Sequence, residues 1–145
     1  MKELVVPVGD PDDASRIAEL IVARLRSEPA RVHLLNVQRP LPKHISQFFS
    51  RADLSDLHRE TGMRALEPVT ALLDRAGVKH EDHVMVGKPA ESIVQFAESH
   101  GDAEIVLDDE PQGVLSVLGL GSIGSQVRRL LVRHHSTDMP PVSSA

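Results

Sequence analysis

The stretch "HEDHVMVGKPAESIVQFAESHGDAEIVLD", residues 80–108, decides the fold, because it holds two apolar runs with an amphipathic segment between them. The runs at 80–87 and 103–108 are short and rich in branched aliphatic residues, which predicts strands. Between them, residues 88–101 have a proline near the start and a glycine at the end, which is typical of a helix. This order predicts two parallel strands joined by a crossover helix.

The same alternation continues on the N-terminal side. "ELVVPV" (3–8) and "RVHLLNV" (31–37) read as buried parallel strands. The segment between them, residues 14–25, predicts a helix. Its inward face is expected to carry Ile17, Leu20, Ile21 and Leu25.

A longer helix is predicted for residues 53–76. Pro68 interrupts this segment, so we expect a kink or a restart there. The side chains expected to point inward are Leu54, Leu57, Leu66, Val69 and Leu73.

On the C-terminal side, residues 109–121 predict a loop and 122–135 a last helix, while 137–142 are at best a stub of a fifth strand. We therefore predict an α/β fold with an open, doubly wound, mainly parallel five-stranded sheet whose last strand is degraded. The length suits one domain over residues 1–145, with 137–145 as a weakly structured tail.

Composition narrows the classes of function. The chain has 145 residues, a net charge of −5, no Cys, Trp or Tyr, and three Phe. Negative charge and scarce aromatic residues argue against binding of nucleic acid. The absence of Cys excludes disulfides and thiolate metal sites and fits a reducing compartment. The first apolar run is too short for a signal peptide or a membrane span, so we expect a cytoplasmic protein without membrane contact.

Ligands of such sheets bind beyond the carboxyl ends of the strands. The segments to inspect are therefore 7–11, 37–40, 86–89 and 107–113.

One of these segments contains "IVLDDE" (105–110), which has roughly the form of a Walker B strand. A Walker B requires a phosphate-binding loop of the form G-x-x-x-x-G-K-[ST]. The one Gly-Lys pair, at 87–88, is followed by Pro89, and Asp82 stands where the first glycine is needed. The chain therefore has no such loop, and the acids read as a solvated turn.

A second motif, "GLGSIG" (119–124), matches G-x-G-x-x-G. A dinucleotide fingerprint belongs after the first strand, with an acid about 20 residues downstream, and neither condition holds here. The glycines still allow the backbone to approach a ligand, and the N–H groups that open a helix favour an anion.

The chain has eight histidines but no H-E-x-x-H, and no nucleophile elbow G-x-S-x-G. His80 and His83 are three apart on a predicted strand and should point to opposite faces. We expect ordinary exposed histidines, no metal site and no catalytic residues, and therefore not an enzyme.

With these features together, the chain resembles a bacterial universal stress protein nearly end to end. The matching pieces are residues 3–8, 31–37, 72–107 and 120–131. The segment 72–107 is the most specific, because it keeps the order of helix end, Ala-Gly turn, strand, Val-Gly-x-Pro-Ala-Glu and helix. The resemblance implies a five-stranded α/β fold, a dimer, and a role in stress adaptation without a defined reaction.

Members of this family that bind ATP carry G-x2-G-x9-G-[ST] after strand four. Aligning the last pair on Gly121 and Ser122 places Asp108 and Pro111 at the first two glycines. Proline removes a backbone donor and adds bulk. Asp108 places negative charge where a triphosphate would lie, which is unfavourable.

The resemblance also concerns the wall of the pocket. ATP-binding members usually have an acid just after strand one, whereas Gly9 stands here and Asp10 follows one residue late. We therefore expect no ATP cofactor, with weak binding of ATP or AMP as the alternative. The positions that match pocket-lining residues of the family are Pro7, Val37, Gly121, Ser122 and Ile123.

The tail departs from the family's last strand, which often pairs across the dimer. Pro140 and Pro141 disrupt strand pairing there. The apolar segment 113–120 would form an exposed patch on a monomer, so we expect it to carry a homodimer or another protein partner. Two functions stay open: a non-enzymatic module that acts through protein contacts, and an adenine-nucleotide-binding protein with weak or no hydrolysis.

Overall fold

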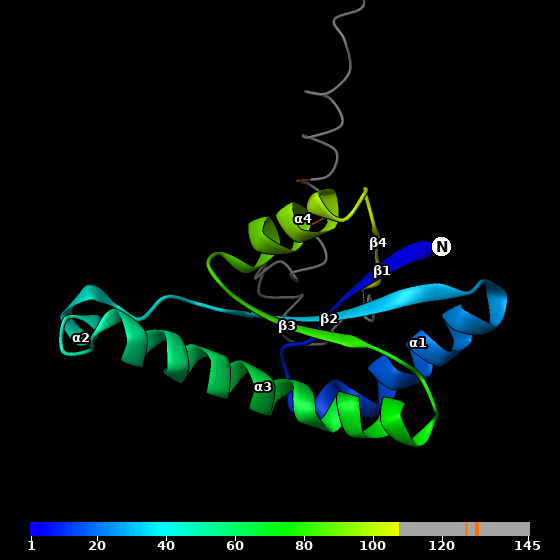
Figure 1. Cartoon of the computed structure of the whole chain (residues 1–145), viewed down its shortest axis with the longest axis horizontal. Coiled ribbons are helices and arrows are strands. Elements are labelled where there is room, and N and C mark those ends of the chain that lie inside the picture. The colour runs from blue at the N-terminus through cyan, green and yellow to red at the C-terminus, as the bar shows by residue number, and fades with distance from the viewer. Residues whose placement is uncertain (108–126, 128–129, 131–145) are drawn as a thin grey trace, which may run out of the picture.

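A parallel sheet forms the centre of the molecule (Figure 1). The computed structural model describes residues 1–107, Val127 and Leu130. The strands are β1 (Lys2–Pro7), β2 (Ala30–Gln38), β3 (Glu81–Val86) and β4 (Glu104–Ile105). They lie in the order β3-β2-β1-β4, and every pairing among them is parallel. This confirms the predicted parallel α/β sheet, while the expected fifth strand and tail lie outside the described residues.

The helices follow the predicted alternation. They are the 3-10 helix η1 (Pro11–Asp13), α1 (Ala14–Ser27), α2 (Lys43–Ser46), α3 (Arg51–Arg75) and α4 (Pro89–Ser99). Ser50 Oγ caps α3 by accepting a hydrogen bond from the N–H of Asp53 at 3.0 Å, and Gly77 adopts a φ of 73° just past its end. Val127 and Leu130 are helical, as predicted for 122–135. Within residues 1–107, no helix combines the length and the apolar character needed to cross a membrane.

Helices cover both faces of the sheet, because successive strand residues point to opposite sides. Val6 and Leu34 face α1 and α3 in one apolar core. Val5 and Leu35 face α4, Val127 and Leu130 in a second core on the other side. The predicted doubly wound arrangement is therefore confirmed, and Figure 1 shows α4 on the side of the sheet away from α1 and α3.

Two leucines expected in the core are exposed. Leu20 is 37% exposed and Leu57 is 39% exposed, so both predictions were wrong. At 3.6 residues per turn, each lies roughly a third of a turn or more from the centre of the buried face of its helix. On α1, the buried face is completed by Ala14 and Ala18 in place of Leu20.

The long helix α3 passes through Pro68 without a restart. The same helix approaches β3 closely at Gly62, which is buried. A Cβ at this position would lie 2.6 Å from Val84 Cγ2 and would also overlap Val84 Cγ1. The absence of a side chain at Gly62 therefore sets the distance between α3 and β3.

Candidate functional site

A surface pocket lies at the carboxyl ends of the central strands, beside the first turn of α4. Its volume is about 420 Å³, within the range of pockets that hold small molecules. Open parallel sheets bind their ligands at this edge. The residues that line it are Pro7, Val8, Gly9, Leu35, Val37, Gln38, Arg39, Pro89 and Ile93.

The structure brings together the predicted site residues that it describes. Pro7 and Val37 share the pocket wall with Gly9, the residue that replaces the family's acid. The other predicted positions lie outside the described residues: Asp108, Pro111, Gly121, Ser122 and Ile123.

Asp10, the acid that follows Gly9, does not line this pocket. Its Oδ1 accepts a hydrogen bond from the N–H of Asp12 at 2.9 Å and caps η1. Among residues 1–107, the pocket wall contains no carboxylate, and its charged member is Arg39. The described wall therefore offers an apolar floor and one cation.

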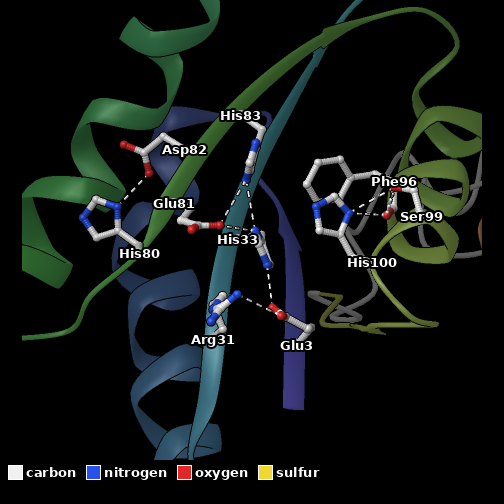
Figure 2. A network of polar contacts seen from close by, with 10 residues as sticks. All are labelled: Glu3, Arg31, His33, His80, Glu81, Asp82, His83, Phe96, Ser99 and His100. Atoms are coloured by element: carbon white, nitrogen blue, oxygen red, sulfur yellow. Dashed lines mark hydrogen bonds and ion pairs between the residues drawn. The ribbon is translucent and has the colours of Figure 1, made fainter. Parts of the chain in front are cut away.

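A second constellation lies nearer the amino ends of the strands, on the face covered by α4. His33 on β2 is paired in register with Glu81 on β3, and His83 follows two residues later on the same face. We call His33, Glu81 and His83 the histidine cluster. Figure 2 shows the three side chains converging between the two strands.

The donor atoms of the histidine cluster are close together. His33 Nδ1 lies 3.0 Å from His83 Nε2 and 3.1 Å from Glu81 Oε2. His83 Nε2 lies 4.0 Å from Glu81 Oε2. On the far side of the His33 ring, Nε2–H donates to Glu3 Oε2 at 2.6 Å. Two imidazoles and a carboxylate thus face one another, and Glu3 holds the ring of His33 (Figure 2).

Two rings cover the cluster, Phe96 on α4 and His100 just after its end. The Phe96 ring lies 4.7 Å from the His83 ring, and the His100 ring lies 4.9 Å from the His33 ring, measured between centroids. Phe96 and His100 stack on each other at 4.1 Å. The side chain of His33 is 2% exposed, while those of His83 and Glu81 are 30% and 55% exposed. The cluster therefore has a closed floor and an open outer side.

The environment sets the protonation of these groups. Burial lowers the pKa of His83, and the adjacent His33 lowers it further. The hydrogen bond from His33 lowers the pKa of Glu3, and the nearby Arg31 acts in the same direction. Metal ions bind the neutral form of imidazole, which a lowered pKa favours at His83.

The expectation of ordinary exposed histidines was wrong at two positions, because His33 and His58 are 2% and 6% exposed. For His33, the sequence contained an indication of burial, because this histidine stands in the middle of the apolar strand "RVHLLNV". The predicted opposite orientation of His80 and His83 holds: His80 bonds to Asp82 and Asp74 at 2.7 and 2.8 Å, away from the cluster. Figure 2 shows the two histidines on opposite sides of β3.

Comparison with known proteins agrees with this architecture. The model of the universal stress protein family matches residues 1–131. A universal stress protein of Thermus aquaticus, encoded in the QAH/OAS sulfhydrylase 3'region, is 28% identical over 128 residues, covering 87% of this chain and 90% of that protein.

Two solved structures share the fold. The hypothetical protein MJ0577 superposes with a TM-score of 0.64 at 26% identity, covering 88% of both chains. A universal stress protein in complex with cAMP has a TM-score of 0.61 at 20% identity, covering 88% of this chain and 90% of that one. With the family match over most of its length, the chain belongs to the universal stress protein family.

Proposed function

We propose that this universal stress protein acts in stress adaptation through protein contacts and takes no ATP as cofactor. Membership of the family supports the stress-related role. The observation that supports the exclusion of ATP is that no acid follows β1 in the wall of the pocket. Gly9 stands in the pocket wall, and Asp10 is used to cap η1. In the sequence, Asp108 and Pro111 stand in place of two glycines of the ATP motif.

A second candidate function is binding of a smaller adenine nucleotide, such as AMP or cyclic AMP. The pocket of about 420 Å³ favours it, because its apolar floor suits a base and Arg39 suits a single phosphate. One structural relative is a complex with cAMP. In both candidates the protein is a cytoplasmic binding module, not an enzyme, and works as a homodimer or with another protein partner.

Calorimetric titration of the full chain separates these functions. ATP with magnesium, AMP and cyclic AMP are titrated in parallel. The primary proposal expects no heat of binding from any of them at micromolar concentrations. Binding of AMP or cyclic AMP without ATP would establish the second candidate. A dissociation constant near micromolar for ATP would contradict the exclusion of ATP.

Restoring the family's residues around the pocket tests why ATP is excluded. A Cβ added at Gly9 meets no atom within 4 Å, so Gly9→Asp fits without a clash. We expect the triple variant Gly9→Asp/Asp108→Gly/Pro111→Gly to gain about tenfold or more in ATP affinity, which corresponds to about 1.4 kcal/mol. Asp102→Gly is the control for the Asp108→Gly change within the triple variant, since it removes one carboxylate from the loop before β4. No gain in the triple variant would mean that the path of the backbone excludes ATP.

A further inference from the structure

We propose that the histidine cluster binds a divalent transition-metal ion of the zinc class, with His33 Nδ1, His83 Nε2 and Glu81 Oε2 as ligands. The site lies on the α4 face of the sheet, between β2 and β3. It is separate from the pocket at the carboxyl ends of the strands. On β2, His33 precedes the pocket residue Val37 by four positions, about 13 Å along a strand.

The distances between the ligand atoms fit one ion. Their separations are 3.0, 3.1 and 4.0 Å. A tetrahedral zinc ion with bonds of about 2.0–2.1 Å holds its ligand atoms about 3.3 Å apart, so the two shorter separations would open slightly and the longest would close by about 0.7 Å. The three side chains therefore need little rearrangement to coordinate an ion.

The partner of His33 on its other side supports the assignment. Histidines that bind metals usually donate their second N–H to a carboxylate, which fixes the ring and its tautomer. His33 Nε2 makes this contact with Glu3 Oε2 at 2.6 Å, and Arg31 lies 3.4 Å from the same carboxylate. With Nε2 as donor, Nδ1 presents its lone pair to the cluster.

The chemistry of the ligands indicates which class of ion binds. The exposed side of the site allows the ion to enter. Two imidazoles and one carboxylate suit zinc and its neighbours, whereas calcium and magnesium prefer oxygen ligands alone. The half-exposed Glu81 leaves the outer side accessible, and His83 also lines a surface pocket of about 480 Å³. A water molecule can complete the coordination from that side.

Bound metal would join β3 to β2 through side chains as well as backbone hydrogen bonds. Since the ligands meet only in the folded sheet, binding raises the stability of the folded chain. The full chain should therefore melt at a higher temperature with zinc chloride than with a chelator.

The experiment is a competition titration of zinc chloride against a chromophoric chelator, using the full chain. One site is expected in the wild type. His83→Gln and Glu81→Gln should each weaken it at least tenfold, and Glu3→Gln should weaken it 10–100-fold, as for other carboxylates that orient a ligand. His44→Gln, on the exposed surface, should leave it unchanged. His80→Gln is a second control, on the opposite face of β3.

Zinc binding that survives His83→Gln and Glu81→Gln, or that is lost in either control, would overturn the proposal, as would absence of binding. X-ray absorption of the wild-type zinc complex keeps the test independent of variant folding. It should show two imidazole ligands and at least one further oxygen ligand, and fewer than two imidazoles would also overturn the proposal.

Discussion

Two single residues, Gly62 and Glu104, each decide a tertiary contact in this fold. At Gly62, a missing Cβ lets α3 approach Val84 on β3. On β4, the carboxylate of Glu104 accepts hydrogen bonds from Arg24 Nε at 2.7 Å and Arg24 Nη2 at 2.9 Å. Lys2 Nζ lies 3.1 Å from the same carboxylate. The first contact is steric and the second is electrostatic, so they respond to different changes.

Gly62→Ala should lower the free energy of unfolding by about 1 kcal/mol. Overpacking against Val84 costs about 1–3 kcal/mol, while alanine recovers up to about 1 kcal/mol of helix propensity. Urea unfolding measures the difference. In a Val84→Ala background the same change should be neutral or stabilising. Equal losses in both backgrounds would show that the contact with Val84 is not the cause, and Thr61→Ala serves as the control on the exposed side of α3.

Glu104→Gln should destabilise the protein in a pH-dependent way. The hydrogen bonds from Arg24 hold the pKa of Glu104 at about 2, against a usual value of 4.5. A carboxyl group with a lowered folded-state pKa stabilises the chain fully above 4.5 and loses that contribution as the pH falls toward 2. The urea midpoint of the variant should therefore lie below wild type at pH 6 and converge with it toward pH 2.

Glu67→Gln, exposed on α3, is the control for loss of a glutamate. If the difference in urea midpoint between Glu104→Gln and wild type stays constant from pH 6 to pH 2, ionisation of Glu104 is not the cause of the lost stability.

At the scale of elements, the pattern of the sequence predicted the strands and helices well, because one face of each is buried against a core. The predicted and observed bounds of β2 are 31–37 and Ala30–Gln38. The short helix α2 was not predicted, since four residues are too few to show a period. Leu20 and Leu57 were assigned inward because residue type alone does not fix where a buried face ends.

The helix α3 carries an element-scale prediction at Pro68. A proline in a helix interior lacks an N–H donor and costs about 3 kcal/mol relative to alanine. It also restricts the unfolded chain, which offsets up to about 1 kcal/mol. Pro68→Ala should therefore raise the free energy of unfolding by about 1–2 kcal/mol, as measured in urea. A loss of stability would show instead that packing of the half-buried ring outweighs the missing hydrogen bond.

The two candidate sites differed in how much of each could be predicted from the sequence. The place of the pocket was expected because open parallel sheets bind ligands at the carboxyl ends of their strands, and Pro7 and Val37 were named because they match pocket positions of the family. The histidine cluster was not predictable, since it depends on the register that sets His33 opposite Glu81, 48 positions apart in the chain. Only the pairing of β2 with β3 brings these residues together.

At the scale of the whole molecule, the apolar segment before the last predicted helix carries a prediction about assembly. The segment 113–120 contains five apolar residues, Val114, Leu115, Val117, Leu118 and Leu120, and the last predicted strand contains two prolines. We expect a homodimer or a complex with another protein that depends on 113–120 more than on the C-terminal tail.

Sedimentation of three proteins tests this: the full chain, a chain ending at His135, and Leu115→Asp/Leu118→Asp. We expect the leucine variant to dissociate and the shortened chain to remain assembled. Phe48→Asp/Phe49→Asp is the control, because Phe48 and Phe49 are 81% and 40% exposed and the two changes add the same charge at other apolar positions. Dissociation of the shortened chain alone would show that the tail forms the interface.

The position of β3 in the sheet affects how the protein behaves at high concentration. Among the described strands, β3 has a neighbour on one side only, so its outer backbone groups can accept a strand from another molecule. Its first two residues, Glu81 and Asp82, are acids, and like charges disfavour such strand addition. This protection is an electrostatic repulsion between exposed charges, so dissolved salt screens it. Buffers of high ionic strength therefore favour edge-to-edge aggregation, and buffers of low ionic strength keep the molecules apart.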